Sequence, residues 1–332
     1  MSEVSLQSVR RANESDRRLT VVSIQINTTC GYRCSYCSEE LHDGRHELEV
    51  ETIQRFLDRA VEHYGALGRR LYMLYSGGEP TAYKGFFKLL EYSKARGCHN
   101  DCVSNGSRPL EWWRKAAPLL EHVSLSFHPE FAEAEKFAEK VRELSQDLLI
   151  HINVLMARRY FASLLKTLDV FANLSERVSV SPKPIRADRS GFDDYTEDEL
   201  EFMRNWELTG KGNPGLRTFP LLLRYSDGTK SVVTSGGPGV QGFTRFRGWG
   251  CEAGISYVAV TFDGNVFSCQ NGVRPLGNIR GEYWFPSESV VCPVEVCLSE
   301  CNHIIPKARF AQGSQHNVSD QQPRPLLALG RF

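Results

Sequence analysis

Strand-like and helix-like segments alternate along residues 20–209, and this alternation restricts the fold more than any other feature of the sequence. The strand-like segments are short and lie at 20–27, 71–76, 101–104, 122–127, 148–156 and 177–181, and the first of them is rich in β-branched residues. The helix-like segments lie at 51–64, 84–96, 110–120, 131–146, 160–173 and 196–206. Strands separated by helices form βαβ units and a parallel sheet. Six strand–helix pairs are too few for a closed eight-fold barrel, so we predict an α/β fold with an open, partial (βα)6 barrel over 20–210.

The sequence pattern changes after Gly210, where Gly and Pro become frequent and short strands replace helices. Two hairpins are predicted, at 221–233 and 257–269, because each has an Asp-Gly turn signal between strand-like runs. Five of the ten cysteines lie between residues 251 and 301. We therefore predict that 211–305 forms a small β-rich domain held together by a metal centre.

The two ends of the chain, 1–19 and 306–332, are polar. The first segment has no apolar stretch of the kind found in signal peptides. The second is rich in Gln, Pro, Ser and Gly and is predicted to be a disordered tail. No apolar run approaches the ~18 residues needed to cross a bilayer, and the formal net charge of zero gives no sign of a nucleic-acid or membrane surface. We expect a cytoplasmic protein with no membrane partner.

Cys30, Cys34 and Cys37 form a C-x3-C-x2-C array directly after the first predicted strand. Thiols stay reduced in the cytoplasm, so clustered cysteines indicate a metal or redox site rather than disulfides. Thiolates are the usual ligands of Fe–S clusters, and three of them leave one iron of a 4Fe–4S cluster open to a substrate or cofactor. The alternative is zinc, whose closed sites need a fourth ligand such as His42.

This array resembles the main motif of the radical S-adenosylmethionine (SAM) superfamily, in which C-x3-C-x-aromatic-C follows the first barrel strand. Tyr36 stands at the aromatic position. The sequence SGGEP at 76–80 resembles the family's Gly-Gly-Glu motif at the end of the second strand. The resemblance implies that Gly77, Gly78 and Glu79 hold the amino group of SAM, because glycines permit a close backbone approach and a carboxylate can bind an ammonium group.

Four polar residues on the next two strands extend the resemblance, which covers about residues 20–185. Ser104 and Asn105 end the third strand, where such enzymes contact SAM. Ser124 and Ser126 lie on the fourth strand, where relatives bind the ribose or the carboxylate, and strand alternation places both on one face. The alternative role of these side chains is to line the barrel.

The resemblance also implies a mechanism. The open iron chelates the amine and carboxylate of SAM, and one electron enters from an external reductant of the flavodoxin or ferredoxin type. The sulfonium is cleaved and methionine leaves. The 5′-deoxyadenosyl radical then abstracts a hydrogen atom from the substrate, while the protein supplies orientation and a dry pocket.

A second group of cysteines resembles the auxiliary-cluster extensions of the same superfamily, called SPASM when they hold two clusters and twitch when they hold one. Its members are Cys251, Cys269, Cys292, Cys297 and Cys301. The two-cluster pattern needs seven cysteines, so we expect one auxiliary 4Fe–4S cluster. The spacing of Cys292 departs most from the pattern, and we therefore expect the other four cysteines to be the ligands. Three ligands with an open iron that contacts substrate are the alternative.

A structural zinc site made by the last three cysteines and His303 is a further alternative for this region. Cys98 and Cys102 lie apart from both groups, and we expect them to pack in the core as small apolar residues.

Three further residues are candidates for a catalytic role. His128 and Lys183 follow the fourth and sixth strands, where ligands bind in parallel α/β folds. His128 could exchange a proton near neutral pH, and Lys183 could hold a carboxylate or phosphate. A surplus Cys292 thiol could give a hydrogen atom to a substrate radical. The alternatives are a structural histidine and a solvated lysine.

The sequence therefore predicts a radical SAM enzyme with one auxiliary cluster, in which hydrogen abstraction leads to rearrangement, epimerisation or oxidation. Relatives with such extensions act on ribosomal peptides and on sugars, so we expect a peptide, sugar or amino-acid-derived substrate. A weaker resemblance to phage-encoded radical SAM proteins gives an isomerase of a modified DNA base as an alternative. A non-catalytic Fe–S or zinc-stapled binding protein is the alternative of another class, and it would have no use for Gly77, Gly78 and Glu79.

Overall fold

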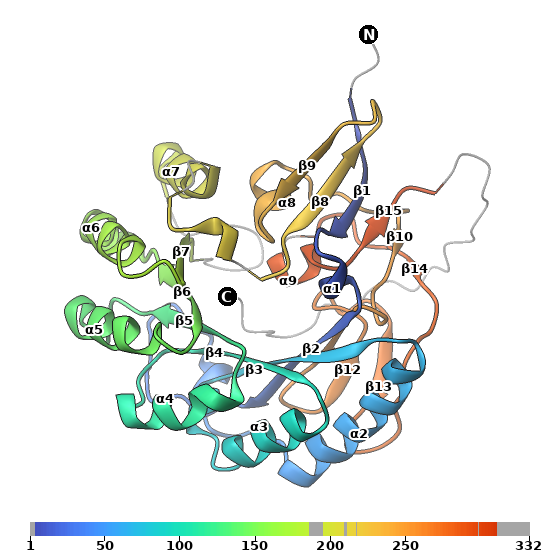
Figure 1. Cartoon of the computed structure of the whole chain (residues 1–332), viewed down its shortest axis with the longest axis horizontal. Coiled ribbons are helices and arrows are strands. Elements are labelled where there is room, and N and C mark those ends of the chain that lie inside the picture. Colours follow the sequence, from blue (N-terminus) through green and yellow to red (C-terminus); the bar gives the residue numbers. More distant parts are fainter. Residues whose placement is uncertain (1–3, 186–194, 209–210, 217, 298, 311–332) are drawn as a thin grey trace. The chain divides into compact units, whose positions relative to one another are not determined.

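The computed structural model describes residues 4–185, 195–208, 211–216, 218–297 and 299–310 (Figure 1). These residues form two compact units, and the chain passes between them several times. The described residues of the first unit lie at 4–23, 51–72 and 218–310. Those of the second unit lie at 24–50 and 73–216.

The second unit is built on parallel strands. Its complete strands are β4 (His99–Ser104), β5 (His122–Phe127), β6 (Leu149–Leu155) and β7 (Val178–Lys183). It also contains the last residues of β2 (Leu19–Asn27) and β3 (Arg70–Gly77). The strands lie in the order β2-β3-β4-β5-β6-β7, and the pairs from β4 to β7 are parallel. The sheet does not close on itself, which confirms the predicted open, partial barrel.

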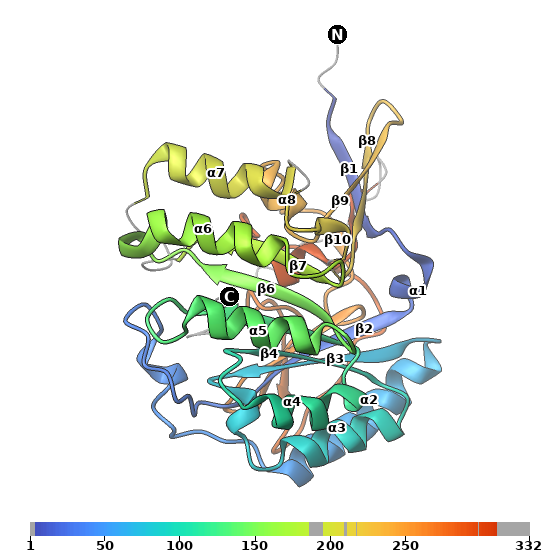
Figure 2. The same cartoon turned by 60° about the vertical axis from the view of Figure 1, so that its left-hand side comes forward.

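Helices follow the strands of this unit as the sequence predicts. They are α3 (Phe86–Ala95), α4 (Leu110–Ala116), α5 (Ala134–Leu144), α6 (Phe161–Ala172) and α7 (Glu197–Leu208). Short 3-10 helices are η1 (Glu39–Leu41), η2 (Pro80–Ala82), η3 (Ala117–Leu119), η4 (Arg158–Tyr160) and η5 (Pro214–Leu216). Helices α3 to α6 lie along the outer side of the strands (Figures 1 and 2). Phe127 on β5, Phe137 on α5 and Phe171 on α6 form one aromatic contact cluster between sheet and helices.

The two faces of the sheet differ because side chains alternate along each strand. The face of Phe127 carries buried apolar residues such as Ile152 and Val180, which face the helices. The register pairs Ser124 with His151 and His151 with Ser179, so these three polar residues share the opposite face. A second polar row two residues further along consists of Ser126, Asn153 and Ser181. The sheet therefore offers one polar face that the helices do not cover.

The first unit is rich in short antiparallel strands, in agreement with the predicted β-rich C-terminal part. One sheet contains β1 (Leu6–Arg11), β8 (Leu221–Tyr225), β9 (Lys230–Val233), β10 (Gly250–Cys251), β14 (Val290–Val291) and β15 (Lys307–Ala308). Its strand order is β14-β10-β15-β1-β8-β9. Strands β11 (Tyr257–Val260), β12 (Asn265–Phe267) and β13 (Pro275–Asn278) form an antiparallel group beside the first residues of β2. The hairpins β8–β9 and β11–β12 confirm the two predicted hairpins.

The remaining helices of this unit are α1 (Glu14–Arg17), α2 (Val50–Ala66, from Glu51 on), α8 (Gly237–Val240) and α9 (Glu300–His303). Helix α2 buries one apolar stripe, in which Phe56 packs on Tyr283 and Phe285. The segment 1–19 contains β1 and α1, which the sequence did not predict. The segment predicted to be a tail begins with β15, and its residues 311–332 lie outside the described part of the chain. Among the described helices, none is long and apolar enough to span a membrane.

Candidate metal and cofactor site

The first cysteine array lies in the loop between β2 and η1. Cys34 is buried, whereas Cys30 and Cys37 are half-buried. A turn brings the last two together, because the Cys37 amide donates to the Cys34 carbonyl at 3.0 Å. A hydrogen bond between these two thiols raises the pKa of Cys34 and lowers that of Cys37. Burial raises the pKa of Cys30 to about 11. The loop thus presents three thiols within one short turn of chain.

Gly77 and Gly78 bring the end of β3 against this loop. Gly77 has a φ of +133°, and a Cβ there would lie 2.3 Å from the Asn27 carbonyl oxygen. A Cβ on Gly78 would lie 2.5 Å from the carbonyl oxygen of Leu41 and 2.6 Å from that of Thr29. The two glycines are therefore required by close contact with the chain itself, whatever ligand they approach.

Glu79 is 2% exposed and accepts four hydrogen bonds from its own unit. Its Oε1 accepts from the Thr81 amide at 3.0 Å, the Thr81 hydroxyl at 2.6 Å and the Ser104 hydroxyl at 2.8 Å. Its Oε2 accepts from the Asn105 amide at 2.7 Å. Burial raises the pKa of Glu79, while these bonds act in the opposite direction. The carboxylate thus fastens the end of β3 to the end of β4.

Asn105 connects this carboxylate to the cysteine loop. Its side-chain nitrogen lies 3.6 Å from the Cys30 sulfur, and its side-chain oxygen accepts from the Ser107 amide at 2.9 Å. The Oδ1 contact fixes the amide orientation so that the Nδ2 group faces the thiol. The structure therefore brings four predicted site residues together: Cys30, Glu79, Ser104 and Asn105.

His128 connects the other side of the loop to the end of β5. Its Nδ1 lies 3.3 Å from the Cys34 sulfur and 3.1 Å from the Tyr36 hydroxyl. The Tyr36 and His128 rings are stacked with centroids 6.0 Å apart, and Tyr32 contacts His128 edge-on. Burial lowers the pKa of His128 to about 4, and burial raises the pKa of Tyr36. The imidazole is thus neutral at pH 7 and can accept or donate one hydrogen bond to the loop.

Glu130 makes a contact that the sequence did not predict. Its carboxylate accepts from the amide and the hydroxyl of Ser35, at 2.8 and 2.5 Å, between Cys34 and Cys37. Arg159 forms a salt bridge to the same carboxylate, whose side chain is 8% exposed. The sequence offered only the position of Glu130 just after a strand, because Ser35 and Glu130 are 95 residues apart.

The polar face of the sheet continues from these loops. His151 Nδ1 lies 2.7 Å from the Ser179 hydroxyl, and its Nε2 lies 3.1 Å from Asn153 Oδ1. The buried Ser126 hydroxyl has no hydrogen-bond partner among the described residues, and Ser124 is half-buried. Lys183 ends β7 on the same face and is buried. The sequence analysis did not predict a role for His151. The signal that was available is strand alternation in 149–155, which places His151 and Asn153 on one face of the strand.

Comparison with known proteins identifies the domain that carries these loops. Residues 24–143 match the model of the Radical SAM superfamily. The matched segment contains the cysteine loop, the two glycines and the Glu79 network. This chain carries a radical SAM domain.

Two curated relatives match parts of the chain. The PqqA peptide cyclase of Methylobacterium nodulans is 30% identical over 152 residues, which cover 40% of this chain and 38% of that protein. The GTP 3′,8-cyclase of Actinobacillus succinogenes is 27% identical over 158 residues, which cover 42% of this chain and 47% of that protein. The chain thus spans less than half the length of these relatives.

A solved structure shows a similar fold. The structure of Streptococcus suis SuiB bound to S-adenosylmethionine matches with a TM-score of 0.51 and 12% identity, over 80% of this chain and 64% of that chain. At this identity the likeness concerns the fold alone.

The C-terminal cysteines lie in the first unit, outside the matched radical SAM segment. Cys251 is in β10, Cys269 follows β12, Cys292 follows β14, and Cys301 is in α9. Four of the five are buried, at 3–7% exposure, whereas Cys301 is half-buried. Burial raises the pKa of Cys251 to about 11, and burial likewise raises the pKa of Cys269, Cys292 and Cys297.

No set of three or more His, Cys, Asp or Glu side chains is placed to hold a single metal ion within the described part of the chain. His303, which the zinc alternative would use, lies with Nε2 2.9 Å from the Cys297 carbonyl oxygen. Cys102 lies in β4, and Cys98 directly precedes that strand. Both are buried, and burial raises the pKa of both thiols.

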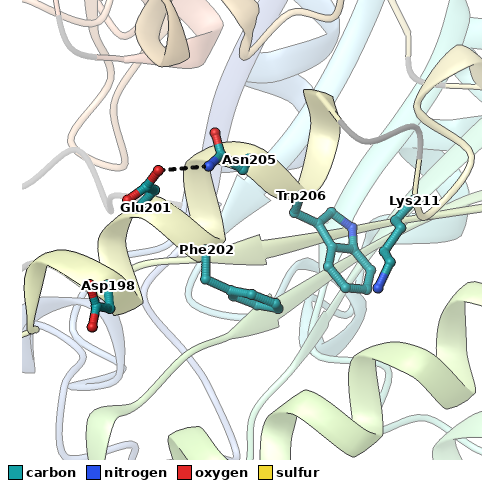
Figure 3. A pocket seen from close by; sticks show the side chains of 6 residues that line it. All are labelled: Asp198, Glu201, Phe202, Asn205, Trp206 and Lys211. Atoms are coloured by element: carbon teal, nitrogen blue, oxygen red, sulfur yellow. Dashed lines mark hydrogen bonds between the residues drawn. The ribbon is translucent and has the colours of Figure 1, made fainter.

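One shallow pocket of about 350 Å³ lies on α7 (Figure 3). It is lined by Asp198, Glu201, Phe202, Asn205, Trp206 and Lys211. It contains none of the predicted site residues. The Trp206 indole Nε1 donates a hydrogen bond to the Val180 carbonyl oxygen at 3.1 Å, which fixes the indole against β7.

Proposed function

We propose that this chain is an enzyme in which Cys30, Cys34 and Cys37 hold a 4Fe–4S cluster beside a SAM site. The observation that carries the proposal is the three-thiol loop held between Asn105 on one side and His128 on the other. When bound, the cluster and SAM supply one-electron cleavage of SAM and abstraction of a substrate hydrogen atom.

The donors around the loop fit a sulfur-rich, negatively charged group. The Asn105 Nδ2 group faces the Cys30 sulfur, and the neutral His128 ring faces the Cys34 sulfur. Hydrogen bonds to cluster sulfurs stabilise their negative charge and raise the reduction potential. Glu130 adds a negative charge near Cys34 and Cys37, and its salt bridge with Arg159 offsets part of that charge.

Glu79, Ser104 and Asn105 form the SAM-binding part of the proposal, together with Gly77 and Gly78. Glu79 Oε1 accepts from three donors, whereas Oε2 accepts from the Asn105 amide, so Oε2 is the oxygen proposed to accept from an ammonium group. The Glu79 network then has two functions: it holds the ends of β3 and β4 in register and it orients one acceptor.

The polar face of β5, β6 and β7 is the proposed surface for SAM and substrate. Ser124 and Ser126 would contact the ribose or carboxylate of SAM, and Lys183 would contact the substrate. The substrate is proposed to be a peptide, a sugar or an amino-acid derivative. Two relatives bear the names of a peptide cyclase and a GTP cyclase, which favours an intramolecular outcome such as ring closure or rearrangement. A flavodoxin- or ferredoxin-type protein is the proposed electron donor.

An auxiliary 4Fe–4S cluster in the first unit is the second part of the proposal. Five cysteines of the C-terminal region lie in one unit of the fold, and one cluster needs at most four of them. The sequence-based expectation uses Cys251, Cys269, Cys297 and Cys301. A cluster with four protein ligands would serve as an electron relay or as a structural staple.

The test replaces Cys30, Cys34 and Cys37 by Ala together. After anaerobic reconstitution we expect about eight irons per wild-type chain and about four in the variant. The variant should form no 5′-deoxyadenosine from SAM and dithionite, as measured by mass spectrometry. A Cys98→Ala variant is the matched control and should keep about eight irons.

Reductive SAM cleavage by the triple variant would refute the first site. A triple variant without iron would refute the auxiliary cluster. Wild type with about four irons and one zinc would show that the C-terminal cysteines bind zinc.

A further inference from the structure

Lys307 and two C-terminal cysteines share one face of the six-stranded sheet. The register of β10 and β15 places Cys251 directly opposite Lys307. On its other side, Cys251 is opposite Val290, and Cys292 follows two residues later on the same face. The Cys292 amide donates to the Trp249 carbonyl at 2.8 Å, which holds Cys292 beside β10. Side chains at such positions are within contact distance across strands.

The Lys307 side chain is a buried cation. It is 3% exposed, and its Nζ donates to the carbonyl oxygens of Asn302 at 2.5 Å and Ile305 at 2.7 Å. The ammonium group also lies 5.1 Å from the centre of the Phe246 ring. No carboxylate lies within 4.0 Å of it in the described part of the chain. A buried charge is costly unless an opposite charge accompanies it, so this site calls for a negative group.

Asn302 connects Lys307 to the loop that follows β12. Its Oδ1 accepts from the Gln270 amide at 3.0 Å, next to Cys269, while its carbonyl accepts from Lys307. Its Nδ2 is buried, and among the described residues its one contact is with the Cys297 thiol, whose pKa that contact lowers. Asn302 is 1% exposed, so this donor requires an acceptor within the protein.

Cys297 completes a set of four buried thiols, and Cys301 differs from them. The charge of Lys307 acts on the thiols of Cys251, Cys292 and Cys297, and Cys269 interacts with Cys251 and Cys297. Cys301 is half-buried, and like Cys269 it lies near the Tyr257 hydroxyl.

We propose that Cys251, Cys269, Cys292 and Cys297 ligate the auxiliary cluster, and that Lys307 is its buried counter-cation. This inference rests on the auxiliary cluster of the proposed function and replaces Cys301 by Cys292 in its ligand set. Four thiolates give the cluster a net negative charge, which one-electron reduction increases. The ammonium group therefore stabilises the reduced form and raises the reduction potential, and Asn302 Nδ2 supplies a hydrogen bond to a cluster sulfur.

The ligand set is tested in the Cys30, Cys34, Cys37→Ala background, where all iron belongs to the auxiliary cluster. We expect Cys292→Ala to reduce iron from about four per chain to below about one, with loss of the EPR signal after dithionite reduction. Cys301→Ala is the matched variant and should keep about four. The proposed ligand set would be overturned if Cys301→Ala lost iron and Cys292→Ala kept it. It would also be overturned if both variants kept their iron or both lost it. A background without iron would instead refute the auxiliary cluster itself.

The counter-cation is tested by potentiometric titration of the same background with EPR detection. In Lys307→Met we expect the ratio of reduced to oxidised cluster at a fixed potential to fall about tenfold, which is about 59 mV for one electron. Lys307→Arg should restore the ratio to within about threefold, and Lys230→Met, at an exposed site on β9, should leave it unchanged.

An unchanged ratio in Lys307→Met with full iron content would show that Lys307 has no electrostatic role. Iron loss in Lys307→Met that Lys307→Arg prevents would support a cationic N–H donor at this position, because Lys and Arg share the charge and the donors and Met has neither. Iron loss in both variants would make Lys307 a packing residue and overturn the assignment.

Discussion

Gly78 has no room for a side chain, whereas Gly31, inside the cysteine motif, does. A Cβ on Gly78 would meet two carbonyl oxygens and the Thr28 carbonyl carbon within 2.8 Å, and no atom lies within 4 Å of the same position on Gly31. We therefore expect Gly78→Ala to reduce the free energy of unfolding by about 1–3 kcal/mol. Gly31→Ala should change it by less than about 0.5 kcal/mol. Urea unfolding of the two variants without iron measures the difference.

The comparison separates chain packing from ligand binding. If Gly78→Ala folds as stably as wild type and fails only to bind SAM, the glycine serves the ligand alone. Equal destabilisation by Gly31→Ala would show that the whole loop is intolerant and that the Gly78 contacts are not specific.

Glu130 is the second residue whose role is readily tested. Its buried carboxylate accepts two hydrogen bonds from Ser35 and a salt bridge from Arg159. Glu130→Gln places an amide group where only acceptors fit, so we expect a loss of about 1–3 kcal/mol in unfolding free energy. It should also lower the iron content of the first cluster, measured after reconstitution. Glu133→Gln is the control, because its exposed ion pair with Lys136 contributes little.

Full iron content and unchanged stability in Glu130→Gln would show that the loop is held by the other contacts alone. The sequence predicts a site at the thiols and the Gly-Gly-Glu segment because their spacing is short and fixed. It did not pair Ser35 with Glu130, or Cys30 with Asn105, because contacts between residues 75 to 95 positions apart leave no local pattern.

At the scale of elements, one side of β6 is buried although it carries hydrogen-bonding side chains and not apolar ones. His151 satisfies the Ser179 hydroxyl and Asn153 Oδ1 at once. His151→Leu removes both bonds and leaves two buried polar groups, so we expect a loss of about 2–4 kcal/mol in unfolding free energy. His151→Gln retains a donor and an acceptor and should recover at least half of it. Thermal unfolding with a known heat capacity change gives the values.

A small effect of His151→Leu, equal to that of His151→Gln, would indicate that water satisfies the two partners and that the face is open. The regular elements of this unit were predictable, because helices and parallel strands follow periods of about 3.6 and 2 along the chain. Strands β10, β14 and β15 were not, since each has two residues and exists only through its partners.

At the scale of the molecule, the first unit unites both ends of the described chain. Strand β1 lies between β15 and β8, whose residues follow it by about 210 to 300 positions. A change in composition at Gly210 predicts a boundary along the chain, but it carries no information on which distant segments join. The division at residue 210 therefore stays a prediction about sequence regions, while the compact units are discontinuous.

Arg11 is the residue that connects the separate segments of this unit. It is fully buried, and its guanidinium group donates to the carbonyl oxygens of Asp16, Leu19, Ser256 and Ile304 at 2.7–3.0 Å. Burial, followed by repulsion from Arg69, lowers its pKa to about 9, so the group remains charged at pH 7. The carbonyl oxygens would lose their donors in Arg11→Met.

We expect Arg11→Met to reduce the unfolding free energy by about 3–5 kcal/mol, because buried acceptors are left unsatisfied in three segments of the chain. Arg10→Met is the matched control: the neighbouring arginine is exposed, and its replacement should cost less than about 0.5 kcal/mol. Urea unfolding at pH 7 measures both. Equal values for the two variants would contradict the connecting role of Arg11. Because Ile304 lies three residues from Lys307, we also expect Arg11→Met, but not Arg10→Met, to lower the iron content of the auxiliary cluster.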